Sequence, residues 1–141
     1  MTSVFFKPVT LQELILKSQI ILSAEFVDKT QNGLDSTENF VVKNVLFSLS
    51  KIEIPTSISV LNANHSFHKA IRDFIRDHGH QGAPSPLFEQ YVSKRKETDT
   101  AVIIFLNESR QPHCPFQFSM DGAIESQDCL DLVVEEIAKT K

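Results

Sequence analysis

Hydrophobic residues near both ends of the chain recur at the three- and four-residue spacing of an amphipathic helix. At the start, these positions are Leu11, Leu14 and Ile15. Thr10, with Glu13 three positions later, is typical of a capping box. Near the end, "DCLDLVVEEIAK" carries a similar stripe, which consists of Leu130, Val133, Val134, Ile137 and Ala138. The pattern therefore predicts an N-terminal helix and a C-terminal helix.

Alternating hydrophobic and polar residues predict three strands in the first half of the chain. The first is expected in "SQIILSAEFVD", with a shared face of Ile20, Leu22, Ala24 and Phe26. The second is expected in "FVVKNVLFSLS", with a shared face of Val41, Val45, Phe47 and Leu49. Between them, the polar residues 29–39 contain the turn dipeptide Asn32-Gly33 and are predicted to form the loop of a long hairpin. A third strand is predicted through Ile58 and Val60.

Two helices are predicted after the third strand, in residues 66–79 and 85–97. The first carries an apolar stripe of Phe67, Ala70, Ile71, Phe74 and Ile75. The inward face of the second is expected to consist of Leu87, Phe88, Tyr91 and Val92. Two more strands follow. The very apolar "TAVIIFLN" is expected at the centre of the sheet, and "PFQFSM" is expected to turn at Asp121-Gly122.

The order of these elements predicts an α+β fold in a single domain that spans residues 1–141. Three strands, a helical insertion and two further strands follow the order of a five-stranded OB-like Greek-key β-barrel. The N-terminal and C-terminal helices would flank this barrel. The alternative is an open antiparallel sheet with helices on one face, and we favour the barrel.

Composition excludes several classes of protein. The chain is 41% hydrophobic and 23% charged, which is typical of a globular protein. Its longest apolar runs are far shorter than the roughly 20 residues that a membrane-spanning helix needs. A net charge of −4 disfavours nucleic-acid binding. Because "MTSVFFKPVT" does not resemble a signal peptide, the chain as written is expected to be cytoplasmic, or periplasmic or secreted if a leader has been removed.

Four of the five histidines, His65, His68, His78 and His80, lie in "NHSFHKAIRDFIRDHGH". A zinc site needs three or four ligands around one ion. However, His68 and His78 would lie about 15 Å apart along the predicted helix, too far to share a metal. No Cys, Asp or Glu nearby is positioned to complete a ligand set with His65. We therefore predict no metal, and the sequence also lacks the motifs that would indicate another cofactor.

The two cysteines, Cys114 and Cys129, leave two interpretations open. They could form one disulfide that closes a short loop, or they could remain thiols in a reducing compartment. Cys114 also follows His113, which raises the alternative of an enzyme with a cryptic Cys/His site. Because adjacent residues of an extended segment point to opposite faces, His113 is badly placed to accept the proton of the thiol.

Acidic residues accumulate toward the end of the chain. Residues 111–138 contain no Lys or Arg, and their carboxylates are Asp121, Glu125, Asp128, Asp131, Glu135 and Glu136. Such a run is either a solvated surface or a surface that attracts a basic protein partner. These carboxylates therefore form a candidate partner surface.

The segment "TLQELILKSQIILSAEFVD" resembles the opening of netrin-like, TIMP-like domains, in which a short helix runs into a first strand. Three later segments, "FVVKNVLFSL", "TAVIIFLN" and "FQFSMDGAIES", are similar to later strands of the same domains. The resemblance implies an OB-fold and a binding role. Family members that inhibit metalloproteases begin with Cys-x-Cys, which chelates the catalytic zinc. This chain has no cysteine before Cys114, so that activity is not carried over.

Together, these observations predict a small non-enzymatic module that binds an unknown protein partner through its loops and its helical insertion. One alternative is an immunity or antitoxin-type inhibitor that blocks a toxin with the acidic surface. The other alternative is the enzyme with a cryptic Cys/His site.

Overall fold

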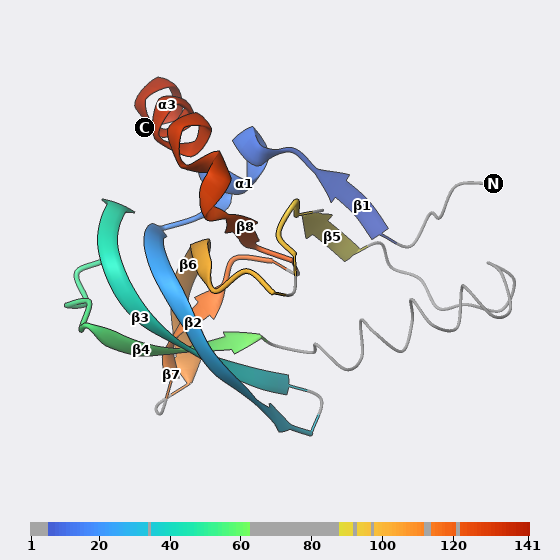
Figure 1. Cartoon of the computed structure of the whole chain (residues 1–141), viewed down its shortest axis with the longest axis vertical. Coiled ribbons are helices and arrows are strands. Elements are labelled where there is room, and N and C mark those ends of the chain that lie inside the picture. The colour runs from blue at the N-terminus through green and yellow to red at the C-terminus, as the bar shows by residue number, and fades with distance from the viewer. Residues whose placement is uncertain are drawn as a thin grey trace, which may run out of the picture.

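The computed structural model describes residues 6–33, 35–62, 88–91, 93–96, 98–111, 114–120 and 122–141 (Figure 1). Within these ranges the fold is α+β, as predicted. Its elements are β1 (Phe6–Val9), α1 (Leu11–Lys17), β2 (Ile20–Asn32), β3 (Asp35–Ser48), β4 (Ser57–Asn62), β5 (Phe88–Tyr91), β6 (Ala101–Gln111), β7 (Cys114–Phe118), β8 (Ile124–Ser126), the 3-10 turn η1 (Gln127–Cys129) and α3 (Leu130–Thr140).

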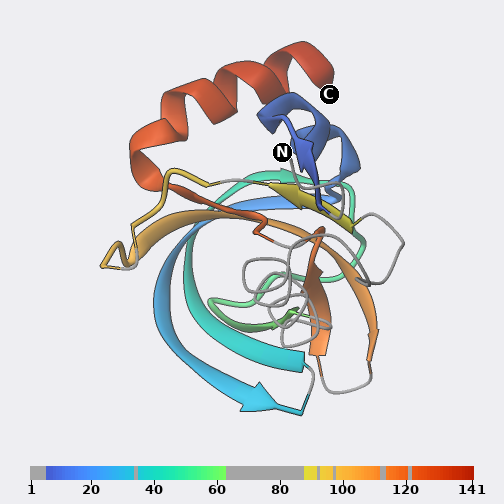
Figure 2. The ribbon, with the colours of Figure 1, turned by 90° about the vertical axis from the view of Figure 1, so that its right-hand side faces the viewer.

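Five strands close into a ring, and Figure 2 shows them curving around a common interior. The ring runs β2-β3-β4-β7-β6, and β6 pairs back with β2. The pairs are antiparallel except for β4 with β7, which is parallel and joins only Val60 to Phe116 and Leu61 to Gln117. β8 adds a sixth strand by pairing with β6. The uneven pairing makes a closed mixed sheet rather than a regular barrel.

The interior of the ring holds the first of two hydrophobic clusters, called here the ring cluster. Among the described residues, its buried members all come from strands and are Ile20, Leu22, Ala24, Phe40, Ile58, Val60, Val102, Ile104, Leu106 and Phe116. The predicted inward faces of β2 and β4 are confirmed by this set. Successive side chains of a strand point to opposite faces, so alternation alone places these residues inside.

The second cluster, called here the helix-side cluster, lies between the outer face of β2 and β6 and the two helices, which lie beside the ring (Figures 1 and 2). Its buried residues are Val9, Leu14, Ile15, Ile21, Tyr91, Ile103, Phe105, Ala123 and Val133. β6 supplies residues to both clusters and is buried on both faces from Val102 to Leu106, which confirms it as a central strand. Thr10 is confirmed as the N-cap of α1, because its Oγ1 accepts a hydrogen bond of 3.1 Å from the Glu13 backbone N–H.

The predicted inward face of β3 is wrong in part. Phe40 is the buried residue, whereas Val45 and Leu49 are 52% and 67% exposed. Phe47 packs against the helix-side cluster instead of the ring interior. The pairing of β2 with β3 shifts register twice within residues 21–24, and each shift inserts one extra residue on β3. The first inserted residue reverses the alternation and the second restores it. Val45, between the two shifts, therefore lies on the opposite face from Val41 and Phe47.

The predicted hairpin loop and the second inserted helix are also corrected. β2 extends to Asn32 and β3 begins at Asp35, and the positive-φ Gly33 lies in the turn between them. Residues 88–91, predicted as helix, form β5 and pair in parallel with β1. Residues 93–96 are not helical either. A distant partner strand therefore overrides the local helical pattern, while the predicted helix in residues 66–79 lies outside the described part of the chain.

The C-terminal helix is confirmed, with a narrower buried stripe than predicted. Val133 is fully buried, and Leu130 and Ile137 pack against the helix-side cluster. Val134 is 47% exposed, and Ala138 is exposed as well. The helix therefore rests on one edge of its predicted apolar face and leaves the other edge uncovered by the described residues.

Candidate functional site

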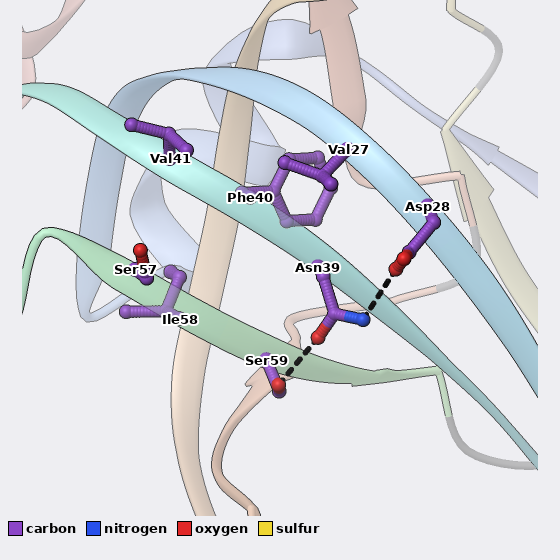
Figure 3. Close-up of a pocket in the computed structure, with 8 residues that line it drawn as sticks. All are labelled: Val27, Asp28, Asn39, Phe40, Val41, Ser57, Ile58 and Ser59. Atoms are coloured by element: carbon purple, nitrogen blue, oxygen red, sulfur yellow. Dashed lines mark hydrogen bonds between the residues drawn. The ribbon is translucent and has the colours of Figure 1, made fainter.

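A shallow groove crosses the outer face of β2, β3 and β4 (Figure 3). It has a volume of about 310 Å³, and its lining consists of Val27, Asp28, Asn39, Phe40, Val41, Ser57, Ile58 and Ser59. Phe40 and Ile58 are buried residues of the ring cluster. The exposed groups of the groove therefore come from the other lining residues, on three neighbouring strands.

Strand geometry explains why these side chains gather on the outside. Asn39 and Val41 flank the inward Phe40 on β3, so the alternation of the strand turns both of them outward. On β2, a register shift between Phe26 and Asp28 leaves Val27 unpaired, and its side chain is 56% exposed. This bulge brings an apolar and an acidic residue side by side at the edge of the groove.

A row of polar side chains runs across the three strands. Asp28 pairs with Asn39, and Asn39 pairs with Ser59, so the three residues lie opposite one another in the sheet. The Asn39 amide nitrogen donates to Asp28 Oδ1, and the Ser59 hydroxyl donates to Asn39 Oδ1 (Figure 3). This relay sets the orientation of the Asn39 amide and directs it at the carboxylate.

Two polar groups in the groove have hydrogen-bonding positions that no described residue occupies. The second carboxylate oxygen of Asp28 accepts no hydrogen bond there, and the Ser57 hydroxyl makes none. The lining contains no histidine, cysteine or lysine that would activate a serine hydroxyl as a nucleophile. The polar groups of the groove can exchange hydrogen bonds with a ligand.

The predicted acidic surface is assembled only in part. Asp128, Asp131 and Glu135 are exposed, while the Glu136 side chain is 22% exposed. Asp131 and Glu135 are four residues apart and so lie on one side of α3, while Asp128 lies in η1 just before that helix. Asp121 lies outside the described residues.

Glu125 does not belong to this surface, because it is 1% exposed. Its carboxylate accepts hydrogen bonds from the Tyr91 hydroxyl at 2.7 Å, from the Ser93 hydroxyl at 3.2 Å and from the backbone N–H groups of Lys94 and Ser126 at 3.1 and 2.6 Å. Burial, followed by the bond to Glu125, raises the pKa of Tyr91. Glu125 therefore joins the end of β5 to β8 as an internal anchor.

Both cysteines are free thiols, so the possible disulfide between Cys114 and Cys129 is not formed. Cys114 donates from Sγ to the Ser59 carbonyl at 3.2 Å, whereas Cys129 packs against the helix-side cluster. Burial raises the pKa of the Cys114 thiol, which disfavours the reactive thiolate. His113, the proposed base, lies outside the described residues. The Cys/His enzyme therefore stays an untested alternative.

Metal ligands are not grouped in the part of the chain that the structure describes. No set of three or more His, Cys, Asp or Glu side chains there could hold an ion. The histidines considered above, His65, His68, His78 and His80, all lie outside that part. Among the described residues, no helix has the length and apolar character needed to cross a membrane.

Comparison with known proteins does not assign this chain to a family. No family model matches the sequence, and a search of curated proteins finds no match. The functional argument therefore starts from the groove itself. Sequence reasoning missed this groove because Asn39 fell in a predicted loop and Asp28 stood at the predicted end of a strand. Asn39 and Val41 are two residues apart, the spacing at which side chains share one face of a strand, and this spacing was the signal that could have indicated the groove.

Proposed function

We propose that this protein is a non-enzymatic, OB-like binding module that holds a segment of a protein partner in the groove on β2, β3 and β4. The order of the ring supports the OB-like part of the proposal. Three successive antiparallel strands are followed by two more, and the last of these, β7, lies parallel to the third, β4. OB-folds bind their ligands on the face of the second and third strands, which correspond to β3 and β4 here.

The observation that carries the proposal is the combination of unused polar groups and apolar side chains in one groove. Asp28 and Ser57 offer hydrogen-bonding capacity, and Val27 and Val41 lie beside them (Figure 3). A polypeptide segment presents both kinds of group, because its backbone donates and accepts hydrogen bonds while its side chains supply apolar surface. The netrin-like resemblance would fit this role, with the groove in place of the missing Cys-x-Cys.

Nucleic acid suits the groove less well than protein. Single-stranded nucleic acid is held by positive charge along the backbone and by stacking of bases on exposed aromatic rings. The groove lining has no Lys or Arg, and its aromatic residue, Phe40, is 1% exposed. A carboxylate at Asp28 would in addition repel phosphate groups.

The test compares two substitutions on the same strand. Val41→Arg places a long side chain in the groove, while Val45→Arg makes the same chemical change at an exposed position of β3 that does not line it. We expect partners retained by the native protein to be retained by Val45→Arg and lost from Val41→Arg, with both variants folded by circular dichroism. Equal retention of all partners by folded Val41→Arg would exclude the groove as the binding site.

A second candidate function uses the acidic face of α3. Asp131 and Glu135 are exposed on α3, Asp128 is exposed in η1 just before it, and the apolar Leu132 and Val134 are 48% and 47% exposed. This combination favours a basic partner, as in an immunity or antitoxin-type inhibitor. Charge reversal at Asp131 and Glu135 should slow association with such a partner and reduce its dependence on salt. Unchanged association kinetics for every partner would remove this candidate.

A further inference from the structure

We propose that the groove recognises an extended peptide with a basic residue followed, or preceded, two positions away by an apolar residue. This inference rests on the proposed function and names the partner chemistry of the same site. The Asp28 carboxylate forms no ion pair with any described residue. Glu25, on the same strand, differs because it lies 3.7 Å from the Lys43 ammonium group. The groove therefore contains an acidic group whose charge is left for a ligand to balance.

The polar row prepares Asp28 to receive a cation. Asn39 donates to one carboxylate oxygen and is itself held by Ser59, so the carboxylate is oriented before any ligand arrives. The other oxygen accepts no hydrogen bond from the described residues. A charge-assisted hydrogen bond from an arginine or lysine side chain would complete this arrangement, and an oriented acceptor lowers the entropic cost of forming it.

The neighbouring valines set the rest of the pattern. In Figure 3, Val27 lies next to Asp28, and Val41 lies two residues from Asn39 along β3. Residues two apart on a strand are separated by roughly 6.5–7 Å and point to the same side. A peptide extended along β3 has the same repeat. When its basic side chain reaches Asp28 beside Asn39, the side chain two positions away therefore meets Val41.

The test uses two blocked tripeptides, acetyl-Arg-Ser-Ile-amide and acetyl-Ile-Ser-Arg-amide, which place the pattern in both chain directions. They are titrated at millimolar concentration into the ¹⁵N-labelled full chain and followed by NMR chemical shifts. We expect at least one peptide to shift the amide signals of Val27, Asp28, Asn39, Val41 and Ser57. Replacing its arginine with neutral, nearly isosteric citrulline should weaken binding by about ten-fold, as expected for a charged hydrogen bond.

Two protein variants test the contribution of the Asp28 carboxylate to peptide binding. Asp28→Asn should weaken binding of the arginine peptide by about ten-fold and leave the citrulline peptide unaffected, while Glu25→Gln, the matched control, should change neither. Equal affinity for arginine and citrulline peptides, or no shift of the groove signals with either arginine peptide, would overturn the inference. Those results leave the proposed function standing if Val41→Arg still loses its partners, so the two failures are distinguishable.

Discussion

The ring cluster and the helix-side cluster lie on opposite faces of β6 and are built in different ways. The ring cluster draws its buried residues from strands alone, at alternating positions. The helix-side cluster combines residues from β1, α1, β2, β5, β6, the turn before β8, and α3. The first therefore follows from a repeating local pattern, whereas the second requires segments far apart in the sequence to meet.

The two clusters also differ in the environment of the buried carboxyl group that each has nearby. Glu38 lies opposite Val60 on β4 and so shares the inner face of β3. Its burial outweighs the nearby charges of Lys29 and Arg95 and raises the pKa of the carboxyl group. Glu125, near the helix-side cluster, is instead surrounded by hydrogen-bond donors. The charged form of Glu38 is thus disfavoured within the ring even with a hydrogen bond to Asn62, while the helix side uses Glu125 as an anchor.

The largest expected losses of stability come from truncating one large buried side chain in each cluster. Phe40→Ala in the ring cluster and Phe105→Ala in the helix-side cluster should each lower the free energy of unfolding by about 3–5 kcal/mol, because both rings are at most 1% exposed. Urea denaturation measures both. A loss below about 1 kcal/mol for either variant would show that its cluster contributes little to the stability of the fold.

Removing the Glu125 anchor should have the next largest effect. Glu125→Ala leaves the Tyr91 hydroxyl and two backbone N–H groups without their acceptor, which should cost about 2–3 kcal/mol in urea denaturation. Tyr91→Phe, which removes one of these bonds, should cost about 1 kcal/mol and serves as the matched comparison. If Glu125→Ala is as stable as the native chain, the anchor has no energetic role.

Two glycines test how closely β5 is packed against the turn before β8. A Cβ at Gly122 would lie 2.2 Å from the Tyr91 carbonyl oxygen, whereas a Cβ at Gly33 would meet no atom within 4 Å. Both residues have positive φ, so Gly33→Ala should cost only about 1 kcal/mol of backbone strain. Gly122→Ala adds the clash and should shift thermal unfolding clearly further. Equal shifts for the two variants would argue against close contact at Tyr91.

The smallest effect concerns the pH dependence that Glu38 imposes on the ring. Because the folded-state pKa is raised above its usual value of 4.5, the contribution of Glu38 to stability is present at lower pH and is lost as the pH rises through the folded pKa. Glu38→Gln removes this titration. The stability of the variant relative to the native chain should therefore increase from pH 4 to pH 7, as measured by urea denaturation. A constant difference across that interval would contradict the proposed burial cost.

The same contrast explains which predictions succeeded. Alternation placed Ile20, Leu22 and Val60 correctly, because β2 and β4 are regular where these residues lie. It failed on β3, where two bulges interrupt the alternation, and in residues 88–91, where pairing with β1 replaces the predicted helix. The single pairing with β1 outweighed helical spacing since local propensity is weak compared with a formed strand pair.

The candidate site was not predicted, for a related reason. Asp28, Asn39 and Ser59 lie far apart in the sequence and become a row only through the register of three strands. Glu125 was assigned to an acidic surface because it stands in an acidic run, yet its position on β8 carries it inside. The sequence shows that a residue is charged. Whether that residue faces solvent or is buried as an anchor depends on the hydrogen-bonding partners that the fold places around it.

The sequence by itself determined the α+β composition of the chain, the capped first helix, the central β6 strand and the apolar faces of the regular strands. These features depend on residues a few positions apart, so their physical cause is contained in a short window. Only the tertiary structure decided the closure of the ring, the pairing of β1 with β5, the burial of Glu125 and the assembly of the groove. Each of these depends on contacts between distant segments, where register and burial override what local spacing favours.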